Sequence, residues 1–303
     1  MLKVKIKDIE FKSPIIASSG TYGYGYEVDN FVDLSKIGCI ITKSITLEPR
    51  EGNPSPRIHE SRSGMINAIG LANVGVEAFC KTKLNKLNSI HTNFIISVAG
   101  STMEDYVQVI NKIEEYEGMH VGYEINISCP NIKKGGMEFG LNKDITYELT
   151  SKLRSITSKL LIIKLSPNVT NIEEIAASAE LGGADAISAI NTFVGLAIDH
   201  KTGRMLLSTT YGGVSGPAIK PLALAKIYKI YQKIKIPIIG IGGISSFEDI
   251  IQFMRVGSTM VQIGTLNYRD PSKISSFYNK LESFLKNNKI SKICDLVGDC
   301  IEG

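Results

Sequence analysis

The chain has 303 residues, of which 43% are hydrophobic and 21% charged, and its 34 basic and 30 acidic residues are spread along the whole length. This composition is that of an ordinary globular protein and argues against a nucleic-acid-binding surface. The five cysteines include no CxxC pair, the first residues lack a signal peptide's apolar run, and no segment is apolar enough to span a bilayer, so we expect no metal site and a reducing, cytoplasmic compartment.

Eight short apolar runs, rich in Ile and Val and each followed by small or polar residues, recur along the chain. Such runs are typical of strands buried on both faces of a parallel sheet. Helical spacing of apolar residues occurs between most of them, as in βαβ units. The expected strands cover residues 14–19, 38–44, 93–99, 122–128, 160–166, 185–191, 237–242 and 259–264, and the expected helices cover residues 103–117, 146–157, 172–181, 221–231 and 247–255.

Eight strands alternating with helices predict a TIM (β/α)8 barrel, and we expect residues 1–303 to form one domain. The alternative is an open doubly wound sheet, which is weakened because no GxGxxG motif follows the first strand. Two long stretches, residues 46–93 and 190–221, follow strands, so we expect them to lie over the C-terminal mouth of the barrel. The tail, residues 272–303, predicts a closing helix and a short extension.

Two lysines, Lys43 and Lys164, stand at predicted C-terminal strand ends, where barrel enzymes place their chemistry. A buried ammonium is costly unless it meets an anion, and neither strand end has a carboxylate nearby in sequence. A structural ion pair is the alternative explanation. We favour a site for a ligand with delocalised negative charge, such as a reduced flavin ring, or for a substrate carboxylate.

Small residues follow the last two strands, where barrels commonly bind phosphate through backbone N–H groups. Gly242 and Gly243 follow the seventh strand, Gly264 and Thr265 follow the eighth, and Gly216 lies in the long stretch before them. A single glycine often only makes a turn. Together these positions predict a phosphorylated ligand with a ring over the barrel mouth, and FMN is the simplest candidate.

Cys129 directly follows the fourth predicted strand, and this position separates it from the other cysteines. A free cysteine is usually an inert small hydrophobe, and we interpret Cys39 and Cys80 in that way. Cys294 and Cys300 lie in the tail and receive no role. Beside a cationic pocket a thiol can ionise and act as a general base, so Cys129 is the candidate catalytic residue.

Four asparagines are expected around the same mouth, namely Asn67, Asn126, Asn131 and Asn191. A lone Asn in a loop is usually a turn residue. An amide offers both a donor and an acceptor, and four of them around one pocket suit an imide or ureide ring.

In nearly its whole length the chain resembles the class 1 dihydroorotate dehydrogenases. The matching segments, in order, are residues 18–25 (SSGTYGYG), 67–71 (NAIGL), 126–131 (NISCPN) and 164–168 (KLSPN), together with the glycines after the last two strands. The combination is highly specific, although no single piece is. Residues 11–16 (FKSPII) and the Gly/Tyr-rich turn after them look most like the class 1B catalytic subunit.

The resemblance implies that the chain oxidises dihydroorotate to orotate in pyrimidine (UMP) biosynthesis. Cys129 would take the C5 proton, hydride would pass from C6 to N5 of FMN, and Lys164 would lie against the N1–C2=O edge of the flavin. The implied cofactor-binding residues are Ser19, Lys43, Ser44, Ser97, Asn126, Lys164, Ile190, Gly216, Gly242, Gly243, Gly264 and Thr265. The implied substrate-binding residues are Lys43, Asn67, Ala68, Ile69, Gly70, Leu71, Asn126, Asn131, Asn191 and Thr192.

The resemblance also implies a partner. In class 1B a second subunit carries FAD and a [2Fe–2S] cluster and passes electrons to NAD, in a heterotetramer that contains two copies of each chain. An iron–sulfur centre would have to come from that subunit, because a cluster needs four thiolates and, of the four cysteines besides Cys129, Cys39 and Cys80 are interpreted as structural. One departure from the family is Ser97, which stands where Asn is common, so we expect that flavin contact to be weaker or mediated by water.

The sequence is also compatible with other functions. A class 1A enzyme, which hands electrons to fumarate, would use nearly the same site, and a dihydropyrimidine dehydrogenase-like FMN barrel would use a similar base. A tRNA-dihydrouridine synthase should carry a basic RNA-binding surface or an appended domain, and neither is visible. Cys129, Lys43 and Lys164 together argue against a barrel that binds a phosphorylated ligand without catalysis.

Overall fold

The computed structural model describes residues 1–128, 130–131 and 137–301, and the side chains of residues 130–139 are not part of that description. Cys129 and the side chain of Asn131 therefore lie outside the described residues. Within the described ranges, no helix combines the length and the apolar character that crossing a membrane requires.

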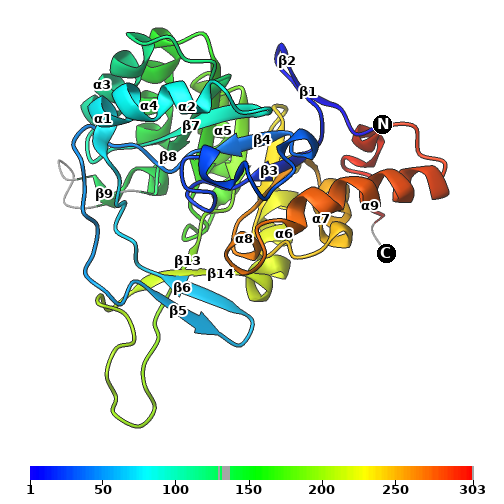
Figure 1. Cartoon of the computed structure of the whole chain (residues 1–303). Helices are drawn as coiled ribbons and strands as arrows, with labels where there is room; N and C mark the ends of the chain where they lie inside the picture. Colours follow the sequence, from blue (N-terminus) through cyan, green and yellow to red (C-terminus); the bar gives the residue numbers. More distant parts are fainter. Residues whose placement is uncertain (129, 132–136, 302–303) are drawn as a thin grey trace.

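Parallel strands close into an eight-stranded barrel at the centre of the molecule (Figure 1). This closure confirms the predicted TIM barrel, and each of the eight expected strands is present. Around the barrel they are β3 (Ile15–Ala17), β4 (Cys39–Ile41), β7 (Asn93–Ala99), β8 (Gly122–Asn126), β11 (Leu160–Leu165), β12 (Ala186–Ala189), β15 (Ile238–Ile241) and β16 (Ser258–Ile263), which pairs back to β3.

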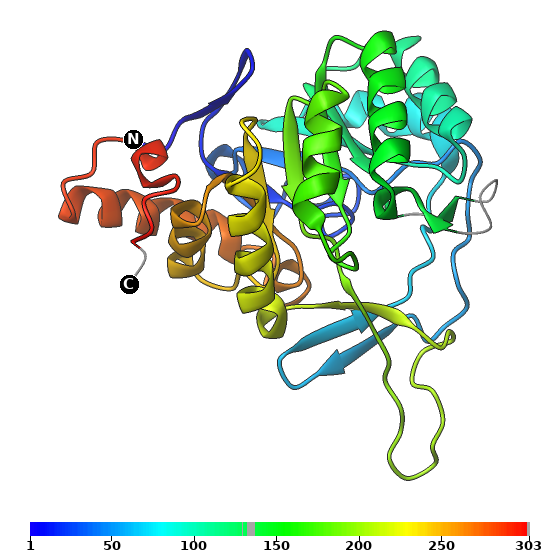
Figure 2. The ribbon, with the colours of Figure 1, turned by 180° about the vertical axis from the view of Figure 1, so that it is seen from behind.

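The apolar runs form central strands because both of their faces are covered. In β11 every residue from Leu160 to Leu165 is buried, since one face fills the barrel and the other packs against helices. The helices form an outer layer, seen from two sides in Figures 1 and 2. They include α3 (Met103–Glu114), α4 (Lys143–Ile156), α5 (Ile172–Leu181), α6 (Lys220–Tyr231), α7 (Phe247–Arg255) and α9 (Lys273–Asn287).

Helices α3 and α4 each begin directly after a residue whose side chain accepts hydrogen bonds from the first backbone N–H groups of the helix. Thr102 and Asp105 form a capping box at the start of α3, so the predicted start at residue 103 is confirmed. Helix α4 begins three residues before the predicted residue 146, because the side chain of Asn142 accepts hydrogen bonds from the backbone N–H groups of Asp144 and Ile145.

The two long stretches meet in one four-stranded antiparallel sheet, in the order β13, β14, β6, β5. Strand β14 pairs with β6, so segments nearly 150 residues apart in sequence lie side by side (Figure 1). The first stretch also contains two helices that the sequence analysis left as loop. The bounds are β5 (Ile58–Ser61), β6 (Gly64–Asn67), α1 (Gly75–Thr82), α2 (Leu84–Leu87), β13 (Phe193–Gly195) and β14 (Gly212–Ser215).

The chain ends lie close together. The backbone N–H of Ile293 donates to the carbonyl of Met1 at 3.0 Å, and the predicted closing helix and short extension of the tail are confirmed as α9 and a 3-10 turn (Figure 1). The remaining short elements are β1 (Val4–Ile6), β2 (Ile9–Phe11), β9 (Pro130–Asn131), β10 (Met137–Glu138), α8 (Leu266–Arg269) and the 3-10 turns η1 (Tyr26–Val28), η2 (Leu34–Lys36), η4 (Phe139–Leu141), η5 (Pro217–Ile219) and η6 (Ile293–Leu296).

Candidate active site

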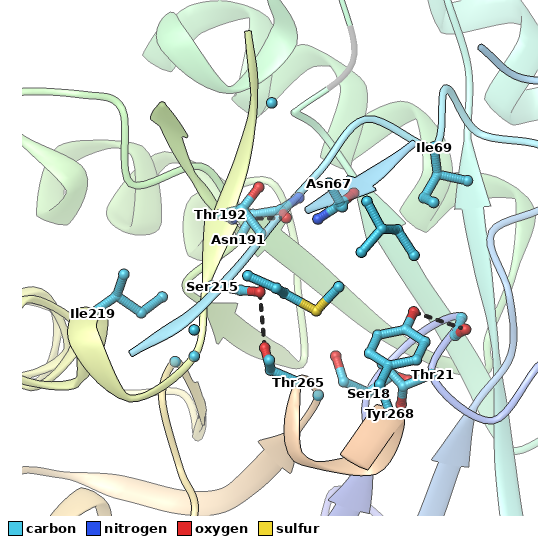
Figure 3. Close-up of a pocket in the computed structure, with 18 of the residues that line it drawn as sticks. Ser18, Thr21, Asn67, Ile69, Asn191, Thr192, Ser215, Ile219, Thr265 and Tyr268 are labelled. Atoms are coloured by element: carbon cyan, nitrogen blue, oxygen red, sulfur yellow. Dashed lines mark hydrogen bonds between the residues drawn. The ribbon is translucent and has the colours of Figure 1, made fainter. Parts of the chain in front are cut away.

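A cavity of about 860 Å³ opens at the mouth of the barrel, between the C-terminal strand ends and the four-stranded sheet (Figure 3). This volume lies within the range of pockets that hold cofactors and small substrates. Many residues singled out from the sequence meet there: Ser19, Lys43, Ser44, Asn67, Ala68, Ile69, Gly70, Leu71, Lys164, Ile190, Asn191, Thr192, Gly216, Gly242, Gly243, Gly264 and Thr265.

Two of the singled-out residues, Ser97 and Asn126, are not among those that line the pocket. The hydroxyl of Ser97 is fully buried and lies 2.8 Å from the hydroxyl of Ser44, which does line the pocket. The side-chain oxygen of Asn126 accepts hydrogen bonds from Asn191 Nδ2 and from the backbone N–H of Ser128, each at 3.2 Å. Both residues therefore support side chains that line the pocket.

Asn191 connects the pocket to the segment that leads to Cys129. Its Nδ2 donates to Asn126 at 3.2 Å and to Ser128 Oγ at 3.1 Å, and its Oδ1 accepts from the backbone N–H of Thr192 at 2.9 Å. Figure 3 shows Asn191 and Thr192 beside Asn67 on one side of the pocket. These bonds fix the orientation of the Asn191 amide before any ligand arrives.

Lys164, at the end of β11, has a carboxylate partner, Glu124, whose identity the sequence did not indicate. Its Nζ lies 3.3 Å from Glu124 Oε1 and 3.3 Å from Ser19 Oγ. Glu124 is 40 residues away in sequence but stands on β8, which pairs with β11 in parallel register. The structural ion pair considered as the alternative for Lys164 is therefore present, because pairing of parallel strands brings residues that are distant in sequence together.

Lys43, which follows β4, has different surroundings. Among the ion pairs of the described residues, Lys43 has no carboxylate partner. Burial lowers the pKa of Lys43, and the nearby positive charge of Arg57 lowers it further. A half-buried ammonium beside a guanidinium favours an anionic ligand, because such a ligand would offset both charges.

The glycines of the predicted phosphate site serve two purposes. A Cβ on Gly216 would lie 2.5 Å from Gly64 Cα, and one on Gly243 would lie 2.7 Å from the carbonyl of Gly216. These two glycines are needed because the turn after β14 packs against both the start of β6 and the turn after β15. A Cβ on Gly264 would meet nothing within 3.6 Å, so the backbone there is open to a ligand.

Hydroxyls complete this end of the pocket. Thr265 Oγ1 donates to Ser215 Oγ at 2.8 Å, and Figure 3 shows the two side chains pointing toward each other. The hydroxyl of Tyr268 lies 3.4 Å from the carbonyl of Gly20, whose own Cβ position is open except for Lys43 at 4.0 Å. Ser215 and Tyr268 were not singled out from the sequence, since isolated hydroxyls in loops carry no pattern.

These features fit FMN. The cavity has room for a ring and a phosphate, and the backbone at Gly20 and Gly264 is open toward it. Hydroxyl and backbone N–H donors at the ends of β15 and β16 suit a phosphate. Lys164 and Lys43 suit a ring that becomes anionic on reduction. Within the described residues, no group of three or more His, Cys, Asp or Glu side chains gathers to hold a metal ion.

A polar cluster inside the barrel is the largest feature that the sequence analysis missed. Glu124 is fully buried, and its Oε2 accepts hydrogen bonds from Ser188 at 2.9 Å and from the amide of Gln262. The sequence did contain a sign of this cluster, because Glu124, Lys164 and Gln262 are polar residues within mostly apolar strands. Such residues in a parallel barrel point either to paired charges or to a site.

Comparison with known proteins agrees with this geometry. The family model described as "Dihydroorotate dehydrogenase" matches residues 1–285. The "Dihydroorotate dehydrogenase B (NAD(+)), catalytic subunit" of Geotalea uraniireducens is 45% identical over 300 residues, covering 99% of this chain and 98% of that protein. The protein of the same name from Geotalea daltonii is 46% identical, and the match covers 98% of this chain and 97% of that protein. The one from Phocaeicola vulgatus is 44% identical, and the match covers 98% of both chains. The chain belongs to the dihydroorotate dehydrogenase family.

Proposed function

We propose that this chain oxidises dihydroorotate to orotate, a step of pyrimidine biosynthesis, as the catalytic subunit of an NAD-linked enzyme. The observation that carries the proposal is the barrel-mouth pocket, where Lys43, Lys164, Asn67 and Asn191 converge. Two cations and fixed amides suit a ligand with a carboxylate and a ring of amide groups. The full-length similarity to catalytic subunits of the B type supports the same assignment.

The proposed cofactor is FMN, bound by residues 1–303 acting as one domain. When bound, it supplies the acceptor for the hydride that leaves C6 of the substrate. Lys164 would stabilise negative charge on the ring, Ser97 would act through Ser44, and Asn126 would act through Asn191. The residues proposed to line the FMN site are Ser19, Lys43, Ser44, Lys164, Ile190, Gly216, Gly242, Gly243, Gly264 and Thr265.

The proposed substrate site lies beside the four-stranded sheet. Residues 67–71 enter from β6 and the turn after it, while Asn191 and Thr192 enter from the end of β12. Asn126 holds Asn191 in place, and Asn131 is assigned here by resemblance. Lys43 would pair with the substrate carboxylate, because it is the pocket lysine with no carboxylate partner among the described residues.

Cys129 is the proposed general base. It would take the C5 proton as the C6 hydride departs, which forms the C5=C6 double bond of orotate. Its own position is outside the described residues, and the support comes from its neighbours: Ser128 is hydrogen-bonded at 3.1 Å to Asn191, which lines the pocket. A base at this point of the chain would stand next to the substrate site.

Electrons are proposed to leave through a second subunit that carries FAD and a [2Fe–2S] cluster, with NAD as the terminal acceptor. This chain is proposed to form a homodimer within that assembly and to work in the cytoplasm. The described cysteines are all free thiols, which suits a reducing compartment.

The proposal is tested by mixing the FMN-loaded chain with dihydroorotate in an anaerobic stopped-flow spectrometer. We expect the flavin absorbance to bleach with dihydroorotate and to persist with dihydrouracil, which lacks the carboxylate. The isolated chain should pass electrons to dyes, and to NAD only after the electron-transfer subunit is added. A flavin that stays oxidised with dihydroorotate would refute the proposed reaction.

The role of Cys129 is tested in the same instrument. Cys129→Ser should slow flavin bleaching at neutral pH by orders of magnitude, because a hydroxyl is a far weaker base than a thiol. The FMN content should stay unchanged. Cys294→Ser, at an exposed cysteine far from the pocket, is the matched control and should behave as the unmodified chain. Equal bleaching rates for the two variants would remove Cys129 from the mechanism.

A further inference from the structure

Glu124 is a fully buried carboxylate at the centre of the barrel, with partners from three other strands. Lys164 of β11 lies 3.3 Å from its Oε1, while Ser188 of β12 and Gln262 of β16 donate to its Oε2. A buried charge persists only where its partners replace the lost hydration. Both oxygens of Glu124 have such partners, so the carboxylate is held in one place.

The cluster ends at the pocket floor. Gln262 donates to Glu124 through Nε2 and accepts from Ser18 Oγ at 3.2 Å through Oε1, so its amide is engaged at both ends. Lys164 Nζ also donates to Ser19 Oγ at 3.3 Å. Ser18, Ser19 and Lys164 line the pocket, whereas Glu124 and Gln262 lie beneath it.

This arrangement leaves Lys164 little freedom. An ammonium has three N–H groups, and among the described residues two of them have acceptors, Glu124 and Ser19. The side chain is only 6% exposed and the Glu124 side chain is not exposed at all. The remaining N–H group is therefore available to a ligand from a fixed position, without the entropy cost of ordering a free lysine.

We infer that Glu124 is a positioning residue for Lys164: together with Ser188 and Gln262 it holds the ammonium at the pocket floor, where Lys164 meets the flavin. The inference deepens the proposed function and rests on the pocket being an FMN site. Glu124 touches no ligand in this scheme and acts through Lys164. A carboxylate that only fills the barrel would instead support the pocket whether or not Lys164 is present.

A double-mutant cycle on FMN affinity separates these two roles. The apo chain and its Glu124→Gln, Lys164→Gln and doubly substituted variants are titrated with FMN, and quenching of FMN fluorescence gives each Kd. We expect each single substitution to weaken binding about tenfold, and the double variant to bind no more weakly than Lys164→Gln alone. Losses that multiply in the double variant, or an unchanged Kd for Glu124→Gln, would overturn the inference.

The double variant and one further variant guard against a folding artefact. Each single substitution leaves an unpaired buried charge, an ammonium in Glu124→Gln and a carboxylate in Lys164→Gln, whereas the double variant removes both charges and is the safest to fold. The comparison of the double variant with Lys164→Gln decides the question even if Glu124→Gln does not fold. Asp185→Asn breaks the Arg154–Asp185 ion pair (2.7 Å) outside the pocket and should change the FMN Kd less than twofold. A tenfold loss there would mean that any lost carboxylate loosens the site, which also overturns the inference.

The result is independent of the proposed reaction. Dihydroorotate is absent from the titration, so a chain that binds FMN but fails to oxidise dihydroorotate still gives a complete cycle. A chain that binds no FMN refutes the FMN site itself. In that case the free energies of unfolding of the same four proteins show whether Glu124 and Lys164 are coupled.

Discussion

Lys43 and Lys164 line the same pocket in different electrostatic surroundings. Lys164 is paired with the buried carboxylate of Glu124, which offsets part of its positive charge. Lys43 has no such partner among the described residues, and burial, followed by the positive charge of Arg57, lowers its pKa. Recognition of an anionic substrate is therefore expected to depend on Lys43 more than on Lys164.

The pH dependence of orotate binding tests this difference. Burial and Arg57 lower the pKa of Lys43, so its positive charge is lost at a lower pH than in a free lysine, and orotate affinity should fall as the pH rises toward that value. Lys43→Gln should bind orotate about tenfold more weakly at pH 7, since one charge-assisted pair is worth ~1.5–3 kcal/mol. Arg57→Gln should move the fall to higher pH, because a repelling charge is gone.

Flavin absorbance on titration with orotate between pH 7 and 10 measures these affinities. Ionisation of the orotate ring itself is common to all three proteins and cancels in the comparison. If Lys43→Gln shows the same decline with pH as the unmodified chain, then another group carries the effect.

His120 is a buried residue with a different pH response. Its Nε2 lies 2.8 Å from the hydroxyl of Tyr123, which in turn donates to Glu114, so Nε2 must carry the hydrogen of that contact. Nδ1 is buried without a partner among the described atoms. Burial, with the charge of Lys159, lowers the pKa of His120 to about 3, so the folded protein holds this imidazole neutral.

Acid should therefore destabilise the fold through His120. Because the pKa in the folded state lies below the unfolded value of about 6.5, the unfolded chain binds more protons, and stability falls as the pH drops below about 6.5. From pH 7 to pH 5 this residue should cost ~2 kcal/mol. Urea unfolding measures the free energy of unfolding at pH 7 and at pH 5. The ~2 kcal/mol decrease should be absent in His120→Gln and still present in the control His91→Gln, which changes an exposed histidine. An identical loss in both variants would contradict the assignment.

At the scale of elements, the pocket depends on the contact between the two long stretches. Strands β6 and β14 pair directly, and Gly216, with a φ of 102°, lies where a Cβ would be 2.5 Å from Gly64 Cα. Any other residue would be strained at this position, because its Cβ would clash with Gly64 and because L residues rarely adopt this φ. The sheet that covers the pocket is therefore held by glycine backbone at this crossing.

Gly216→Ala should separate β6 from β14 and weaken FMN binding about tenfold, measured by fluorescence titration. Gly203→Ala is the matched control, because Gly203 also has a positive φ, 68°, but has nothing within 4 Å. It carries only the backbone strain, ~1–2 kcal/mol, and its FMN Kd should stay within twofold of the unmodified chain. A Kd for Gly216→Ala as close to that of the unmodified chain as the Kd of Gly203→Ala would show that the FMN site does not depend on this crossing.

The elements differ in how far the sequence predicts them. The barrel strands are recognisable because burial on both faces requires continuous apolar runs, and residues at their ends, such as Lys43 and Asn191, follow from that. The sheet over the mouth was not predicted, since its strands have three or four residues each and pair across nearly 150 positions. The Glu124–Lys164 pair depends on the register of β8 against β11, which no local pattern contains.

At the scale of the whole molecule, one segment projects away from the barrel. Residues 196–211, here called the arm, run between β13 and β14 and extend beyond the sheet in both views (Figures 1 and 2). Ile198 and Met205 face each other across the arm and are 52% and 45% exposed, and Leu196 and Tyr211 are exposed as well. Apolar side chains gathered on a projecting element are typical of a surface that contacts another chain.

The arm is expected to contribute to the proposed homodimer, and a charge placed on it should weaken association. Ile198→Glu combined with Met205→Glu should raise the dimer dissociation constant at least tenfold in sedimentation measurements, because two carboxylates would have to be buried in the interface. The FMN Kd should not change, since neither residue lines the pocket. Lys201→Glu, at an exposed polar position of the same arm, adds similar charge without removing apolar surface and should leave the dimer intact. A dimer that survives the double substitution but no longer reduces NAD with the electron-transfer subunit would assign the arm to that partner instead.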